Sequence, residues 1–135
     1  MEIEMLSLDG NCLETVVAWQ RAAGILEVCG YCAVDAFGKH HLIQLTNHAG
    51  RPDAFEISPL EEETAQLAAR QRGWQIVAFL HTHPSHSPDM SSRDALCFER
   101  DTLPWIIIGT PTSDPCQRTY VPTVFAKQAK QVASK

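Results

Sequence analysis

The chemically richest stretch of this chain brings two histidines, a serine and an aspartate together at short spacing. His81-Thr82-His83-Pro84 is followed by Ser91 and Asp94. Imidazole nitrogens and carboxylate oxygens are common zinc ligands, and three of them leave a fourth position open for water. A structural zinc site is instead closed by four ligands, usually including cysteine. The pattern therefore favours a catalytic zinc ion that acidifies water and polarises a carbonyl group.

A strand must carry the two histidines. Residues 75–80 are an apolar run rich in branched and aromatic side chains, which predicts a buried strand that continues into His81. Side chains at positions i and i+2 of a strand point to the same side. His81 and His83 can therefore converge on one ion, while Thr82 faces away.

A helix start must carry the aspartate. Pro84 ends the strand, and Ser91 with Asp94 three residues later resembles a capping box, which predicts a helix to about Arg100. Asp94 would then lie in the first helical turn, facing the strand end. Asp89 and His86 are rival third ligands, but both belong to the loop, where no regular element fixes their direction.

This set of residues resembles the signature of the JAMM (MPN-plus) metallopeptidases, including its proline. That family also carries a glutamate upstream, and Glu27-Val28-Cys29-Gly30 fits its Glu-x-Cys-Gly context. The resemblance implies one zinc ion per chain. It also implies the residue roles: His81, His83 and Asp94 as zinc ligands, Glu27 as the general base acting through the zinc-bound water, and Ser91 as the group that steadies the tetrahedral intermediate.

The resemblance also implies an α/β fold: a mixed, curved β-sheet flanked by helices, in the JAMM/MPN architecture related to the cytidine deaminases. Within the prokaryotic branch, Leu103-Pro104-Trp105 is similar to the strand that follows the aspartate helix in the N-terminal domain of lambda-type phage tail assembly protein K. Another branch cleaves after the glycine tail of ubiquitin-like sulfur carriers. The expected substrate is a protein or peptide with an extended chain end, either ubiquitin-like or a phage-tail protein, lying along the strand beside the site.

The remaining pattern alternates helices and strands, as expected for this fold class. The second predicted helix has the strongest signals, with Ser58 as N-cap, proline at its first position and Glu61 completing a capping box. Its expected inner face carries Leu60, Thr64, Leu67 and Ala68. The other expected elements are a helix over 12–23 capped by Asn11, a hairpin of strands 26–35 and 41–46, and strands over 54–57, 104–109 and 120–125.

Composition is that of one globular domain. The chain has 135 residues, of which 44% are hydrophobic and 20% charged, and we expect a domain over 1–126 followed by a basic tail over 127–135. A net charge of −5 opposes nucleic-acid binding. No apolar run is long enough to span a membrane, and the acidic start does not resemble a secretory signal, so we expect a cytoplasmic protein.

Two other functions compete with the metallopeptidase. A catalytically silent MPN scaffold is one, although such scaffolds typically lose a ligand and every expected position is filled here. A thiol redox protein is the other, because Cys29 and Cys32 form a Cys-x-x-Cys pair. Within a strand, however, residues at i and i+3 face opposite ways. We expect all five cysteines to be reduced thiols and predict no metal role for His40, His41 or His48.

Overall fold

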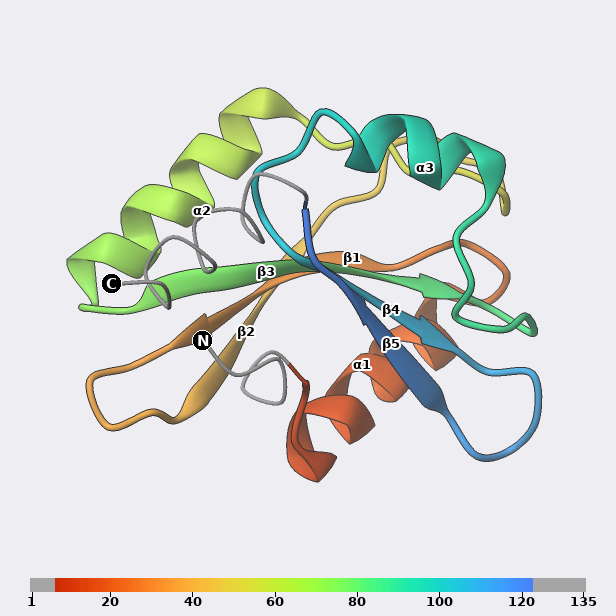
Figure 1. The fold of residues 1–135 in the computed structure, drawn as a ribbon, viewed down its shortest axis with the longest axis horizontal. Helices are drawn as coiled ribbons and strands as arrows, with labels where there is room; N and C mark the ends of the chain where they lie inside the picture. Colours follow the sequence, from red (N-terminus) through yellow and green to blue (C-terminus); the bar gives the residue numbers. More distant parts are fainter. Residues whose placement is uncertain (1–6, 123–135) are drawn as a thin grey trace, which may run out of the picture.

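The computed structural model describes residues 7–122, which form three helices and one five-stranded sheet (Figure 1). The elements follow in the order α1 (Gly10–Ala23), β1 (Cys29–Val34), β2 (His40–Leu45), α2 (Pro59–Gln71), β3 (Gln75–His83), α3 (Ser92–Phe98), β4 (Trp105–Gly109) and β5 (Cys116–Tyr120).

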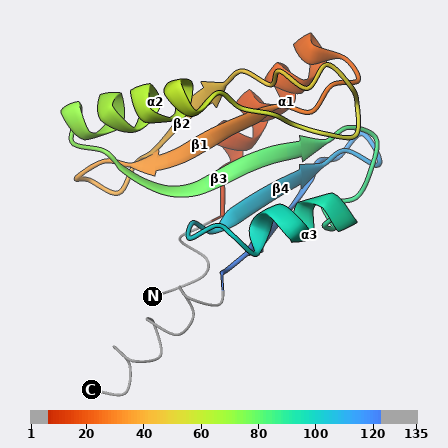
Figure 2. The same cartoon turned by 90° about the horizontal axis from the view of Figure 1, so that it is seen from above.

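The sheet is mixed, as predicted. Its strands lie in the order β2-β1-β3-β4-β5, and β3 pairs with β4 in parallel, whereas every other pair is antiparallel. Figure 2 shows the bend of β3 along its length. Because β1 and β4 pair with the two edges of β3, this central strand presents no free edge to which an extended peptide could add.

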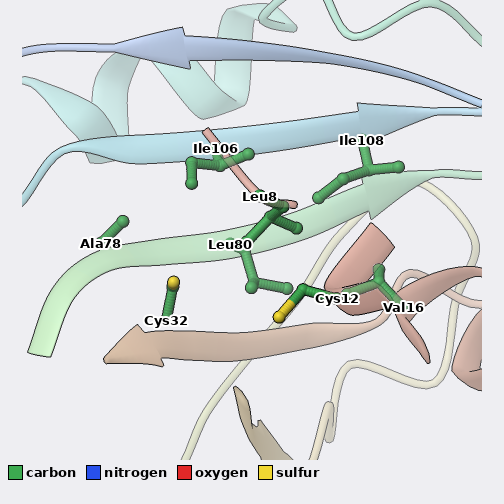
Figure 3. Packing of buried hydrophobic residues seen from close by; sticks show 8 residues of the cluster. All are labelled: Leu8, Cys12, Val16, Cys32, Ala78, Leu80, Ile106 and Ile108. Carbon is green, nitrogen blue, oxygen red and sulfur yellow. The ribbon is translucent and has the colours of Figure 1, made fainter. Parts of the chain in front are cut away.

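The helices divide between the two faces of the sheet, with α1 on one face and α2 and α3 on the other (Figure 1). Alternate residues of each strand build two cores. The core under α1 is shown in Figure 3 and contains Leu8, Cys12, Val16, Cys32, Ala78, Leu80, Ile106 and Ile108. The core under α2 and α3 contains Cys29, Tyr31, Leu45, Ala65, Phe79 and Trp105.

Several predicted boundaries are wrong. The N-cap of α1 is Asp9, whose side chain accepts the backbone N–H of Cys12, so the helix begins before Asn11. Residues 54–57 form no strand, and α3 stops at Phe98. The last described strand covers 116–120 instead of 120–125; residues 123–125 lie outside the described part of the chain.

The inner face of α2 also differs from the prediction. Ala65 and Ala69 are its buried residues, whereas Leu60 is 72% exposed and Leu67 is 50% exposed. Apolar residues occur on more than one side of this helix, so side-chain hydrophobicity alone did not identify the side that packs. Among the described residues, no helix combines the length and apolar character that crossing a membrane requires.

Candidate metal centre

The two histidines lie at the end of β3 on the face covered by α2 and α3, and α3 places Asp94 opposite them. Nε2 of His83 lies 2.9 Å from Oδ2 of Asp94, and Nε2 of His81 lies 3.6 Å from Oδ1 of the same carboxylate. All three side chains are buried. The predicted convergence of these residues is thus present in the structure.

Both ring nitrogens of His83 face oxygen acceptors. Nδ1 lies 3.0 Å from the carbonyl oxygen of Ser87, and Nε2 faces Asp94. Burial by itself lowers the pKa of His83, but these two hydrogen bonds and the nearby carboxylates outweigh burial and raise it. The bond to Ser87 fixes Nδ1 as a donor, so a metal ion can take the place of the proton on Nε2.

Asp94 is held by the start of α3. Its backbone N–H donates to Oγ of Ser91 over 3.0 Å, and its Oδ2 accepts the N–H of Ser91 over 3.1 Å, completing the capping box predicted from the sequence. Burial by itself raises the pKa of Asp94, but the hydrogen bond from His83, the charge of His81 and the Ser91 amide together lower it. The carboxylate is therefore ionised and oriented before any ligand binds.

Glu27 lies on the other side of His81. Its Oε1 is 3.4 Å from Nδ1 of His81. The predicted strand over 26–35 includes Glu27, but the structure places this residue just before β1, and only 7% of it is exposed. A carboxylate this deeply buried requires a partner.

Three buried atoms at this centre have no hydrogen-bond partner among the described residues: Oε1 of Glu27 and both ring nitrogens of His81. Leaving buried polar atoms unsatisfied is costly, and native structures usually supply a protein group, water or ion. Nitrogen and carboxylate donors suit zinc. The donor set therefore fits a divalent metal ion.

Two overlapping sets of donors can hold that ion. His81 and His83 belong to both sets, and the third donor is either Asp94 or Glu27. Asp94 faces Nε2 of both histidines. In the other set, a carboxylate oxygen of Glu27 and one ring nitrogen of each histidine all lie within 4.8 Å of one another. We favour Asp94, because it faces Nε2 of both histidines, whereas Glu27 approaches His81 from its Nδ1 side. Glu27 is then free to act on a ligand of the metal.

A polar network missed by the sequence reasoning connects α1 to the segment that carries Glu27. The hydroxyl of Thr82 donates to Oε1 of Gln20 and accepts the backbone N–H of Val28 over 2.9 Å. Nε2 of Gln20 donates to the carbonyl oxygens of Gly24 over 2.7 Å and Leu26 over 2.9 Å. Thr82 faces away from the candidate ligands, as predicted, and its hydroxyl holds the backbone next to Glu27.

Asn47 fixes the same segment from the opposite side. Its Nδ2 donates to the carbonyl oxygen of Glu27 over 2.9 Å and to that of Ala54 over 3.1 Å. Its Oδ1 accepts the N–H groups of Ala49 and Glu56. Together with the backbone hydrogen bond from the N–H of His48 to the carbonyl oxygen of Glu56, these bonds hold residues 48–57 beside the site, and the short strand predicted over 54–57 does not form.

The loop between β3 and α3 packs closely on the end of β4. A Cβ atom added to Gly109 would lie 2.4 Å from the carbonyl oxygen of His86 and 2.7 Å from backbone atoms of Ser87 and Pro88. Only glycine leaves room for this approach. Since Ser87 also orients His83, Gly109 contributes indirectly to the geometry of the candidate ligand.

A cavity of about 370 Å³ opens over the centre, and its lining includes Glu27, His83 and Ser91. The hydroxyl of Ser91 accepts the Asp94 amide and can still donate its proton into this space. Asp89 and His86 also line the cavity, but both are exposed, and Asp89 is engaged by Arg118 and by Ser87. Neither rival lies within the buried donor group.

Comparison with known proteins identifies the family. A family model described as prokaryotic homologs of the JAB domain matches residues 10–121. The chain belongs to the Prok-JAB family. No curated protein matches this Prok-JAB chain.

Solved structures that share the fold of this Prok-JAB chain include three proteins. A protein from Desulfitobacterium hafniense has 23% identity and a TM-score of 0.72, with 86% of this chain and 84% of that chain covered. A Salinibacter ruber protein has 20% identity and a TM-score of 0.56, with coverages of 84% and 79%. A JAB1/MPN domain protein from Archaeoglobus fulgidus has 20% identity and a TM-score of 0.51, with 82% of each chain covered. At these identities the likeness supports the fold alone.

The cysteine pair of this Prok-JAB domain does not form a redox centre. Cys29 belongs to the core under α2 and α3, whereas Cys32 belongs to the core under α1, so the two thiols lie on opposite faces of the sheet. Burial, with smaller contributions from nearby Cys12 and Asp9, raises the pKa of Cys32 to about 12. Burial also strongly raises the pKa of Cys29. Neither thiol is a ready nucleophile.

Two histidines outside the centre have carboxylate neighbours that the sequence did not indicate. Nε2 of His41 lies 2.9 Å from Oδ2 of Asp35. Nδ1 of His40 lies 3.9 Å from Oδ2 of Asp9, and with Cys12 these residues form a second group of donor atoms, all within 4.8 Å of one another. The prediction of no metal role rested on sequence spacing, which did not reveal these neighbours.

Proposed function

We propose that this Prok-JAB domain is a zinc-dependent peptidase or isopeptidase of the JAMM type. The observation that carries the proposal is His81: its buried ring has no hydrogen-bond partner among the described residues and lies between two carboxylates, Asp94 at Nε2 and Glu27 at Nδ1. His81, His83 and Asp94 would hold one zinc ion, which would supply Lewis acidity and a water of lowered pKa.

The remaining residues supply the other requirements of amide hydrolysis. Glu27 borders the cavity as a carboxylate that can accept a proton from the attacking water and return it to the departing amine. Ser91 can donate a hydrogen bond to the carbonyl oxygen as negative charge develops there. The cavity of about 370 Å³ is large enough for the residues flanking one amide bond.

The substrate we propose is a protein or peptide with an extended chain end, either a ubiquitin-like carrier or a phage-tail protein. The chain end cannot pair with β3, since both edges of that strand are occupied.

The tripeptide Leu103-Pro104-Trp105, which suggested the relation to the phage protein, has a structural role here. The Pro104 carbonyl accepts the N–H of Phe79, and Trp105 belongs to the core. We further propose a cytoplasmic location and a domain over 1–126; the tail predicted over 127–135 lies outside the described residues.

Metal content separates this proposal from a silent MPN scaffold. JAB/MPN families include metallopeptidases and inactive members. We expect one equivalent of zinc in purified protein, and loss of that zinc when His81 and His83 are both replaced by Ala. A folded parent protein that binds no zinc would exclude the enzyme and favour the scaffold.

Activity requires a substrate, which a trap can identify. Glu27→Gln protein should keep its metal and release substrate slowly, so proteins that co-purify with it are candidates. Cleavage of a captured protein by the parent, abolished by chelation and restored by zinc, would support the proposal. Captured proteins that the zinc-loaded parent leaves intact would contradict it.

A further inference from the structure

A second cavity, larger than the one over the candidate metal centre, lies apart from it. It has a volume of about 550 Å³ and is formed between α2, the end of α3 and the sheet. Phe55, Phe79 and Trp105 form its aromatic wall. The same rings pack against His81, with ring centroids 4.8, 6.0 and 5.3 Å from the imidazole, respectively. The cavity and the metal centre thus share one wall.

The charged residues of the lining are both acidic. Glu62 from α2 and Asp101 from the turn after α3 both border the cavity, and no lysine or arginine does. Asp101 is held rigidly, because its Oδ1 accepts the N–H groups of Thr102 and Leu103 and its Oδ2 accepts the indole N–H of Trp105. The structure therefore aims a fixed carboxylate at an aromatic pocket.

The Glu62 carboxylate differs from that of Asp101, because it makes neither a hydrogen bond nor an ion pair with any residue between 7 and 122, although the Glu62 backbone N–H donates to Ser58 within the helix. Burial, followed by the negative charge of Asp101, raises its pKa. Two carboxylates facing one apolar space repel each other, and a cation between them would remove that repulsion.

We propose that this cavity binds the side chain of an arginine in the substrate, about two or three residues from the bond that is cleaved. A guanidinium group is flat, stacks on aromatic rings and donates several hydrogen bonds to carboxylates, whereas an ammonium group is more strongly hydrated. The inference rests on the proposed peptidase function and adds a substrate preference to it.

The separation of Phe79 and His81 gives the distance between the cavity wall and the scissile bond, for a substrate that does not pair with β3. Phe79 in the cavity wall precedes His81 by two residues, which corresponds to about 7 Å along a strand. An extended peptide also advances about 3.3 Å per residue. A side chain entering the cavity therefore belongs to a residue close to, but not beside, the bond at the metal.

Binding can be tested without any catalysis. N-acetyl-arginine amide would be titrated into full-length protein, with the neutral isostere N-acetyl-citrulline amide as the matched ligand, while the indole N–H signals are followed by NMR. We expect the arginine compound to shift the signal of Trp105 but not those of Trp19 and Trp74, which lie outside the cavity lining. The citrulline compound should bind at least about 10-fold more weakly, because a charged hydrogen bond is lost.

Variants assign the binding to the cavity. Glu62→Gln should weaken binding of the arginine amide about 10-fold, whereas Glu63→Gln, on the exposed side of the same helix, should leave it unchanged. Asp101→Asn is a second test if its turn remains folded. Equal binding of both ligands, no shift at Trp105, or an unchanged affinity in Glu62→Gln would overturn the inference.

A peptide library separates this inference from the proposed function. Zinc-loaded protein should cleave peptides with arginine at one fixed position, and Glu62→Gln should remove that preference while cleavage continues. Cleavage without any preference for arginine would overturn the inference alone. Arginine binding without cleavage of any peptide would instead overturn the peptidase proposal and leave the ligand class of the cavity established.

Discussion

Ser87 and His83 are joined by a hydrogen bond between a backbone carbonyl and a ring nitrogen, with 3.0 Å between the oxygen and Nδ1. The bond leaves Nε2 facing Asp94. Because Ser87 lies in the loop that packs on Gly109, the orientation of a candidate metal ligand depends on a glycine in a different strand.

Replacing Gly109 by Ala should therefore weaken metal binding. The added methyl group would collide with backbone atoms, which cannot move aside as a flexible side chain can. We expect zinc affinity to fall about 10- to 100-fold, the usual effect of disturbing groups that orient a ligand. Competition with a chromophoric chelator measures this. Gly10→Ala is the control, since nothing lies within 4 Å of its added Cβ and it should retain full affinity.

Asp94 and Asp89 should differ sharply when each is replaced by Ala. Only Asp94 is buried against both histidines, whereas Asp89 is exposed and bonded to Arg118. Asp94→Ala should lower zinc affinity by more than about 100-fold, since a ligand contributes more than the groups that orient it. Asp89→Ala should change it little. The reverse order in isothermal titration would remove Asp94 from the ligand set.

Glu27→Gln tests whether this residue is a base or a ligand. The replacement keeps the side-chain volume and removes the proton acceptor, so zinc should remain bound while hydrolysis falls about 10²- to 10⁴-fold. Rates must be measured with the zinc content of the same sample. Loss of zinc instead would favour the donor set in which Glu27 replaces Asp94.

The thiols should differ strongly in reactivity. Cys29 and Cys32 are buried with raised pKa values, whereas Cys97 is exposed. In folded protein at pH 8, Cys97 should react with a disulfide reagent first, and Cys29 and Cys32 only on unfolding. Replacing Cys29 and Cys32 by Ala should cost about 1 to 2 kcal/mol each and leave zinc content unchanged. Loss of zinc in a folded double variant would mean that sulfur holds the metal.

Asp9 should contribute a pH-dependent part of the stability. Its pKa is lowered, chiefly by the hydrogen bond from the Cys12 N–H. A carboxyl group whose folded pKa lies below its unfolded value of 3.8 stabilises the fold above about pH 4, and this stabilisation is lost as the pH falls through the folded value. Asp9→Ala should lower the free energy of unfolding by about 1 kcal/mol at pH 7.

Asp9→Asn is the matched control, because asparagine caps helices about as well without the charge. Its difference from the parent should shrink between pH 7 and pH 3 in denaturant titrations. A difference that grows towards low pH would contradict the assigned pKa direction.

The convergence of His81, His83 and Asp94 was predictable because its signals are local. Side chains alternate in direction along a strand, which placed His81 and His83 on the same side, and the spacing of Ser91 and Asp94 indicated the start of the helix. The position of Glu27 depended on the family resemblance, because its burial arises from contacts distant in sequence. Gln20 and Asn47 gave no signal, since a polar residue that accepts and donates across 20 residues or more looks like any surface residue in the sequence.

The errors share a physical cause. Leucines on α2 suggested the wrong face, because the residues of this helix that become buried are Ala65 and Ala69. Residues 54–57 have a strand-like composition, yet the side chain of Asn47 satisfies part of their backbone and no strand forms. Both outcomes depend on tertiary contacts that outweigh local propensity.

Thr82 shows that the spacer of a His-x-His motif can be as constrained as its histidines. Only 1% of this residue is exposed, and its hydroxyl both accepts and donates a hydrogen bond on the side of the sheet away from the metal. A sequence profile that accepts any residue at this position ignores the hydrogen bonds that connect β3 to α1 on the other face of the sheet. A hydroxyl residue at this position together with an amide residue on α1 would form a two-residue signature. This signature would identify family members that hold the segment of the upstream glutamate as Thr82 and Gln20 do here.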